Sequence, residues 1–138
     1  MVPSTTEQPL PGGSSDDLKG LRVLLVEDSW HVGRAMKSLL AVLGATVDGP
    51  AASTAEAERL LAAHSPDVAI IDFRLREGES ASGLIDRLND QGVGVIVVSG
   101  YEVLPVPAVK AEAVLQKPVS EAQLLAVLRP LVARKAAR

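Results

Sequence analysis

Residues 68–72 read VAIID, four consecutive apolar residues that lead directly into an aspartate. A short, uninterrupted apolar run is typical of a strand that is buried on both faces of a parallel sheet. Residues 65–67 (SPD) are turn formers, so the strand is expected to begin just after them. The pattern therefore places Asp72 at the carboxyl end of a buried strand.

Four more strands are predicted on either side of this one. They cover residues 21–26 (LRVLLV), 45–47 (ATV, broken by Gly49-Pro50), 93–98 (VGVIVV) and 114–115 (VL). Helical patterns separate them, beginning at a Ser29 cap and ending at Gly44, beginning at a Ser53–Glu56 capping box, and covering about residues 82–89 and 120–133. Strands that alternate with helices predict βαβ units, a parallel sheet and right-handed crossovers.

The composition favours one α/β domain of a cytoplasmic protein. Hydrophobic residues make up 47% of the 138, but the chain has one Phe, one Tyr and one Trp, so aliphatic side chains must fill the core. The absence of Cys excludes disulfides and thiolate metal sites and fits a reducing compartment. A net charge of −3 gives no bias toward nucleic acid, and we find neither a membrane-spanning run nor a secretory signal.

The ends of the chain are expected to lie outside the folded domain. Residues 1–20 are rich in Pro, Gly, Ser and Thr and have no periodic apolar pattern. We predict a disordered tail over residues 1–20, a domain over residues 21–134 and a C-terminal tail over residues 135–138. Removal of residues 1–20 should then change the thermal stability little.

Polar residues follow four of the five predicted strands. Glu27 and Asp28 follow the first, Asp72 the third, Ser99 the fourth and Lys117 the fifth. Ligands of open parallel sheets bind beyond the carboxyl ends of the strands, so we expect these side chains to converge at one edge. Taken singly, each would more often be a turn former or a helix cap. Their joint placement predicts a site.

The residue types at this edge point to phosphoryl chemistry. Clustered acids repel one another, and their oxygens suit a hard cation such as Mg²⁺, which also neutralises phosphoryl oxygens. Lys117 would pair with an anion, and Ser99 would donate a hydrogen bond to a phosphoryl oxygen. Asp72 would then be the nucleophile and accept the phosphoryl group as an acyl phosphate.

The motifs resemble those of a known family. VLLVEDS (23–29), AIID (69–72), VVSG (97–100) and LQKPVS (115–120) stand in the order found in the receiver domains of two-component response regulators, over about residues 21–134. The resemblance implies a doubly wound α/β fold of the flavodoxin-like type, with a five-stranded parallel sheet in the order 2-1-3-4-5. It also implies phosphorylation of Asp72, phosphoryl contacts from Ser99 and Lys117, and a Mg²⁺ site made of Glu27 (through water), Asp28, Asp72 and the backbone carbonyl of Arg74.

The chain departs from this family before Lys117. Receivers carry an aromatic switch residue three positions before the lysine, where this chain has Val114. Pro105 and Pro107 predict a shortened or irregular fourth helix.

The alternative switch would lie at the end of the fourth strand. Tyr101 follows Ser99 and Gly100, in partial similarity to FATGUY-type single-domain receivers. We expect Ser99, Gly100 and Tyr101 to form the switch, and residues 101–110 to become ordered on phosphorylation.

The resemblance implies a single-domain response regulator, which is a signalling domain rather than an enzyme. Its phosphodonor would be a histidine kinase, favoured to be of the HWE type, or a phosphotransfer protein. No output domain follows the last helix, so the protein would signal by contact with an unidentified protein or act as a phosphate sink, without binding nucleic acid or membrane. Two alternatives stay open: a pseudo-receiver that only binds partners, and a small Mg²⁺-dependent phosphatase, which would need an acid at the position of Arg74.

Overall fold

Five parallel strands form one sheet in the order β2-β1-β3-β4-β5. The computed structural model describes residues 16–73, 81–100 and 111–137. The strands are β1 (Arg22–Val26), β2 (Thr46–Ala51), β3 (Val68–Asp72), β4 (Gly94–Ser99) and β5 (Ala113–Gln116). The helices are α2 (Trp30–Val42), α3 (Thr54–Ala63), α4 (Ser82–Asp90) and α5 (Glu121–Ala136). The predicted doubly wound α/β fold and its strand order are confirmed.

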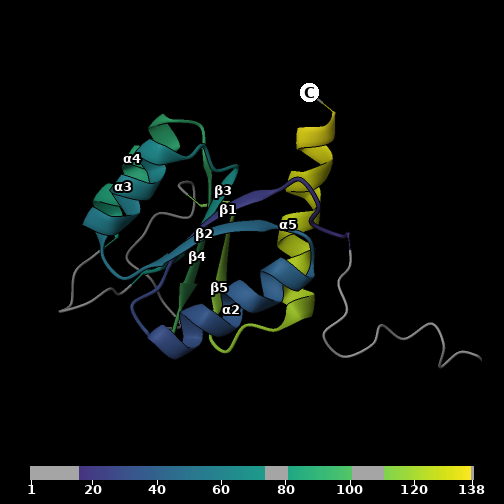
Figure 1. Cartoon of the computed structure of the whole chain (residues 1–138), viewed down its shortest axis with the longest axis horizontal. Helices are drawn as coiled ribbons and strands as arrows, with labels where there is room; N and C mark the ends of the chain where they lie inside the picture. The colour runs from purple at the N-terminus through teal and green to yellow at the C-terminus, as the bar shows by residue number, and fades with distance from the viewer. Residues whose placement is uncertain (1–15, 74–80, 101–110, 138) are drawn as a thin grey trace, which may run out of the picture.

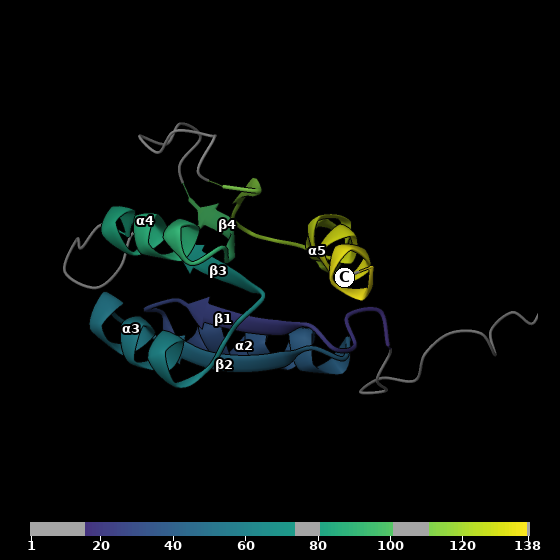
Figure 2. The same ribbon diagram turned by 90° about the horizontal axis from the view of Figure 1, so that it is seen from above.

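Helices cover both faces of the sheet. Figure 1 shows α3 and α4 on one side and α2 and α5 on the other, and Figure 2 shows the strands in succession from β2 to β4. Alternate residues of β1 enter separate cores: Leu24 and Val26 face α3 and α4, whereas Val23 and Leu25 face α2 and α5. Strands with two buried faces explain why the apolar runs in the sequence are uninterrupted.

Serine residues cap three of the helices. The Ser29 hydroxyl accepts a hydrogen bond from the backbone N–H of Val32, and Ser120 forms a full capping box at the start of α5. The Ser53 hydroxyl accepts from the N–H of Glu56, as predicted. The reciprocal half of that box is shifted by one residue, because the Glu56 carboxylate accepts from the N–H of Ala52.

The predicted break in the second strand is wrong. β2 continues through Gly49 and Pro50 to Ala51, with a register shift against β1 and a positive φ of 110° at Gly49. β2 lies at the edge of the sheet, so the missing N–H of Pro50 does not interrupt a ladder on its outer side.

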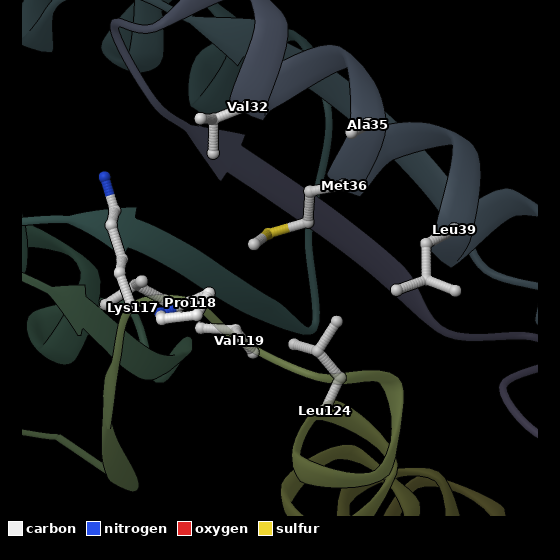
Figure 3. A pocket seen from close by; sticks show the side chains of 9 residues that line it. Val32, Ala35, Met36, Leu39, Lys117, Pro118, Val119 and Leu124 are labelled. Atoms are coloured by element: carbon white, nitrogen blue, oxygen red, sulfur yellow. The ribbon is translucent and has the colours of Figure 1, made fainter.

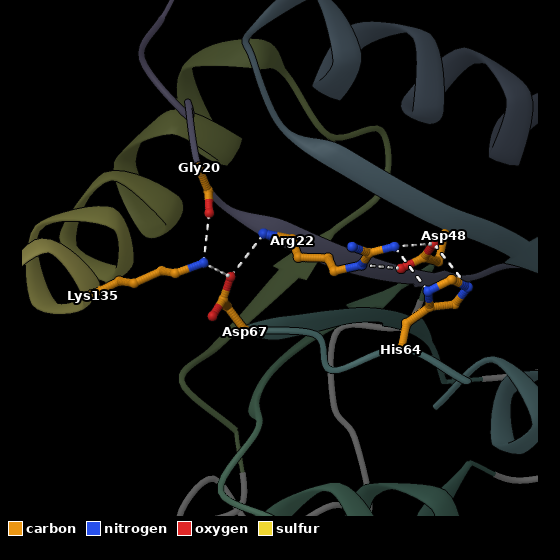
Figure 4. A network of polar contacts seen from close by, with 6 residues as sticks. All are labelled: Gly20, Arg22, Asp48, His64, Asp67 and Lys135. Carbon is orange, nitrogen blue, oxygen red and sulfur yellow. Dashed lines mark hydrogen bonds and ion pairs between the residues drawn. The ribbon is translucent and has the colours of Figure 1, made fainter. Parts of the chain in front are cut away.

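The predicted tails are too long at both ends. The Leu18 side chain is fully buried in the core beneath α2 and α5, and its backbone N–H donates to the carbonyl of Leu43 at 2.8 Å. At the other end, Lys135 lies within α5 and its ammonium donates to the carbonyl of Gly20 (Figure 4). A single buried leucine is too short a signal for periodicity to detect, and residues 1–15 lie outside the described part of the chain.

The prediction of a shortened fourth helix concerns residues 101–110, which lie outside the described residues. None of the helices in the described ranges combines the length and the apolar character needed to cross a membrane.

Candidate phosphoacceptor site

Three carboxylates meet at the carboxyl end of the sheet. Glu27 and Asp28 follow β1, Asp72 ends β3, and one oxygen from each lies within 4.8 Å of the others. The strand register brings them together, because Val26 pairs with Ile71 and the next residue of each strand is an acid. Glu27 and Asp72 are 5% and 7% exposed, so the protein places two buried acids side by side.

Lys117 supplies a cation to this cluster. Its ammonium lies 3.2 Å from a Glu27 carboxylate oxygen and 3.3 Å from a carboxylate oxygen of Asp72. β5 sets this position, since Gln116 pairs with Ser99 and the N–H of Lys117 donates to the Ser99 carbonyl at 2.8 Å. One ammonium thus faces two buried carboxylates.

The cluster changes the protonation of its own members. Burial raises the pKa of Glu27 and the neighbouring charge of Asp72 raises it further, although the N–H of Ser29 and the ammonium of Lys117 act in the opposite direction. Burial lowers the pKa of Lys117, but Glu27 and Asp72 more than offset this, so that its pKa is raised. The lysine therefore stays charged, whereas the ionised form of Glu27 is less favourable than that of an exposed carboxylate.

The donor set fits a hard divalent cation. Carboxylate oxygens are the ligands that Mg²⁺ prefers, and three of them within 4.8 Å leave room for water at the other positions. A cation here would also favour the ionised form of Glu27, which burial disfavours.

Ser99 lies beside the cluster on the neighbouring strand. Asp72 pairs with Val98, and the N–H of Phe73 donates to the Val98 carbonyl at 3.1 Å, so Ser99 follows at the same edge. Its side chain is 2% exposed. Gly100 is exposed, and a side chain there would meet nothing within 4 Å.

Some of the predicted features cannot be placed. Arg74, whose carbonyl was expected to bind the metal, and Tyr101 of the predicted switch lie outside the described residues. Val114, at the position of the usual switch residue, is 47% exposed on β5.

An apolar groove of about 510 Å³ begins at Lys117. α2 forms one wall with Val32, Ala35, Met36 and Leu39, and residues 117–119 with Leu124 form the other (Figure 3). The groove shares Lys117 with the charged cluster.

Two contributors to the geometry of Glu27 were not predicted from the sequence. The N–H of Ser29, predicted to act only as a helix cap, donates to the second Glu27 carboxylate oxygen at 3.0 Å. Gly33 of α2 lies directly against Pro50, where a Cβ atom would not fit, and close to the stem of Glu27. A glycine inside an otherwise good helical pattern was the available signal.

Comparison with known proteins assigns the chain to one family, in agreement with its fold. The family model of the response regulator receiver domain matches residues 23–129. No curated protein matches the chain.

Solved structures with the same fold include a CheY-like receiver domain from Methylobacillus flagellatus, with 24% identity and a TM-score of 0.72 over 80% of this chain and 98% of that one. SdrG from Sphingomonas melonis Fr1 has 23% identity and a TM-score of 0.68 over 89% of this chain and 99% of SdrG. The response regulator PhyR from Brucella abortus has 20% identity and a TM-score of 0.75, with coverage of 88% of this chain and 51% of PhyR. At these identities the likenesses show the fold.

Proposed function

The chain belongs to the family of response regulator receiver domains, the signalling domains of two-component systems, and we propose that it accepts a phosphoryl group on Asp72. Receiver domains bind Mg²⁺ in an acidic pocket, and the Glu27, Asp28 and Asp72 cluster is the acidic pocket of this chain. The observation that carries the proposal is the position of Asp72, a buried carboxylate with an ammonium 3.3 Å away and two further acids beside it.

In the proposed reaction an Asp72 carboxylate oxygen attacks the phosphorus atom of the donor. A new O–P bond forms, the bond between phosphorus and the donor atom breaks, and its electron pair leaves with the donor. Lys117 lies where its ammonium can move from the carboxylate to the transferred phosphoryl oxygens, and Ser99 can donate a hydrogen bond to one of them. The product is an aspartyl phosphate.

Asp28, Asp72 and, through water, Glu27 would hold the cation, together with the carbonyl of Arg74. When bound, Mg²⁺ supplies positive charge to the transferred phosphoryl oxygens. Glu27 is oriented for this role by the N–H of Ser29 and by Lys117, which contact its two carboxylate oxygens.

The proposed phosphodonor is a histidine kinase or a phosphotransfer protein. A donor phosphohistidine must reach Asp72 next to Lys117, and the apolar groove between α2 and residues 117–119 shares Lys117 with the site. We therefore place the donor protein in this groove. The partial FATGUY similarity at residues 99–101 favours a kinase of the HWE type, and the output is contact with a further protein or withdrawal of phosphate from the kinase.

Phosphorylation in solution tests the proposal. The full chain is mixed with acetyl phosphate and Mg²⁺, and intact mass spectrometry should show the addition of one phosphoryl group. Asp72→Asn keeps the shape of the side chain but lacks the anionic nucleophile, so its mass should not change, and EDTA should also abolish the gain.

Asp90→Asn, an exposed position at the end of α4, is the matched control and should be labelled like the wild type. Stoichiometric labelling of Asp72→Asn would contradict the assignment of the nucleophile. An unlabelled wild type that still binds a partner kinase would favour a pseudo-receiver.

A further inference from the structure

We infer that Gly33 is a positioning residue for the metal site, because the absence of its side chain lets helix α2 lie close enough to β2 to hold Glu27 in place. This inference rests on the proposed function, since it assigns a role in Mg²⁺ binding to a residue that touches neither metal nor substrate.

The space beside Gly33 is already occupied. A Cβ atom on Gly33 would lie 2.8 Å from Cβ and 2.9 Å from Cγ of Pro50, and 3.4 Å from Cγ of Glu27. The first two separations are below any normal carbon–carbon contact. The Pro50 ring thus occupies the site of the missing methyl group, and the stem of Glu27 lies at an ordinary van der Waals distance from it.

Helix formation does not explain this glycine. Gly33 lies in the interior of α2 without a positive φ, where Ala would be the better helix former. Gly83 is a useful comparison, since it also lies in a helix but a Cβ atom there would meet nothing within 4 Å. The close approach to Pro50 distinguishes Gly33 from Gly83.

Pro50 has little freedom to move away. Its ring is rigid, and β2 shifts its register against β1 at this place. The next residue, Ala51, accepts a hydrogen bond from the N–H of Glu27 at 2.8 Å. Gly49 lies against the carbonyl of Leu25, so β2 is tied to the end of β1 on both sides of Pro50.

Glu27 is bound both to β2 and to the start of α2, so a displacement of α2 from β2 would reach it. Its backbone is bound to Ala51, its stem contacts the space at Gly33, and its carboxylate is held by the N–H of Ser29 at 3.0 Å and by Lys117 at 3.2 Å. A methyl group at position 33 would push α2 and β2 apart at Pro50. Because the N–H of Glu27 is bound to Ala51 of β2 and its carboxylate to the N–H of Ser29, the cap of α2, this shift would draw the carboxylate away from at least one of its partners.

The test compares Gly33→Ala with Gly83→Ala in the full chain. Mg²⁺ titration is followed by the fluorescence of Trp30, the single tryptophan, which lies two residues after Asp28. Asp28→Ala, which lacks a proposed Mg²⁺ ligand, shows the fluorescence titration expected when the metal site is lost. Gly33→Ala should bind Mg²⁺ more weakly by on the order of tenfold, the usual effect of disturbing a residue behind a metal ligand. Gly83→Ala should bind like the wild type.

A second measurement uses protein without metal. The N–H of Ser29 reports the position of the Glu27 carboxylate, so its NMR shift in EDTA should change in Gly33→Ala and stay unchanged in Gly83→Ala. If the wild type fails to bind Mg²⁺, the proposed function falls, but the Ser29 signal still decides the role of Gly33. Wild-type Mg²⁺ affinity or an unmoved Ser29 signal in Gly33→Ala would overturn the inference.

If Gly33→Ala does not fold, the double variant Gly33→Ala with Pro50→Ala replaces it. Pro50→Ala removes the Cγ contact at 2.9 Å and so relieves part of the overlap, whereas the Cβ contact at 2.8 Å remains to displace α2. The Mg²⁺ affinity of the double variant should be below that of Pro50→Ala alone. Equal affinities would again contradict the inference.

Discussion

The carboxyl and amino edges of the sheet both carry charged clusters, but only the amino edge is balanced. Within the described ranges, the carboxyl edge brings Glu27, Asp28 and Asp72 to one ammonium, that of Lys117. At the amino edge, by contrast, each acid has its own base (Figure 4).

The pairs at the amino edge have good geometry. Arg22 donates two hydrogen bonds to Asp48, at 2.9 and 3.2 Å, and one of its nitrogens lies 2.9 Å from Nδ1 of His64. Asp67 accepts from the N–H of Arg22 and from the ammonium of Lys135, both at 2.8 Å. These contacts join β1, β2 and α5 with Asp67, the residue before β3.

The difference separates a structural cluster from a functional one. A balanced, partly buried network stabilises the fold without a ligand. An excess of buried carboxylates over bases destabilises the folded state unless a cation is bound. Unbalanced buried charge of this kind is expected at functional sites. Substitutions at the amino edge should therefore change stability, and those at the carboxyl edge should change metal binding.

The largest effect is expected from removal of residues 1–20. The deletion takes away Leu18, whose burial contributes about 1.5–3 kcal/mol, and the Gly20 carbonyl that binds Lys135. We expect a loss of about 2–4 kcal/mol in the free energy of unfolding, measured by urea denaturation, with unchanged Mg²⁺ affinity. A chain that begins at Asp16 is the control and should keep nearly full stability. Equal stability of the two truncated chains would show that Leu18 does not anchor the fold.

Asp→Asn substitutions at the two edges should change stability in opposite directions. In EDTA, Asp67→Asn should lower the free energy of unfolding by about 1–3 kcal/mol, because it removes the charge that binds Lys135. Asp28→Asn should raise it by about 0.5–1 kcal/mol, because it relieves repulsion among three acids.

Saturating Mg²⁺ provides the matching measurement. It should stabilise the wild type and Asp67→Asn, because a ligand that binds the folded state adds to its stability, but have little effect on Asp28→Asn. Destabilisation by Asp28→Asn in EDTA would mean that the carboxyl edge is balanced after all.

The smallest effect is expected from Glu27→Gln, and it depends on pH. Burial raises the pKa of Glu27 above its ordinary value of 4.5, so the folded state favours the protonated acid. Without metal, the stability contributed by this group is fully present below pH 4.5 and is lost as the pH rises through the raised pKa. Glu27→Gln should therefore gain stability over the wild type between acid and neutral pH in EDTA, by less than the effect of Asp67→Asn. Thermal unfolding at several pH values measures the difference, and a constant difference across this range would contradict it.

Local patterns were sufficient for most of the fold. The uninterrupted apolar runs before Glu27, Asp72 and Ser99 predicted buried parallel strands, because a strand that is covered on both faces has no reason to alternate. The rule that parallel strands end at the same edge then placed the acids and Lys117 together. These features depend on residues close in sequence and on a general property of parallel sheets.

Contacts between distant segments could not be derived in the same way. The burial of Leu18 depends on Leu43 and α5, and the passage of β2 through Pro50 depends on its place at the sheet edge. The sequence by itself determined which segments form strands and which polar residues follow them, including the residues of the acidic site. Each of these features has a local pattern. Only the tertiary structure decided how closely α2 approaches β2 at Gly33, because a missing side chain has meaning only when the atoms that fill its place are known.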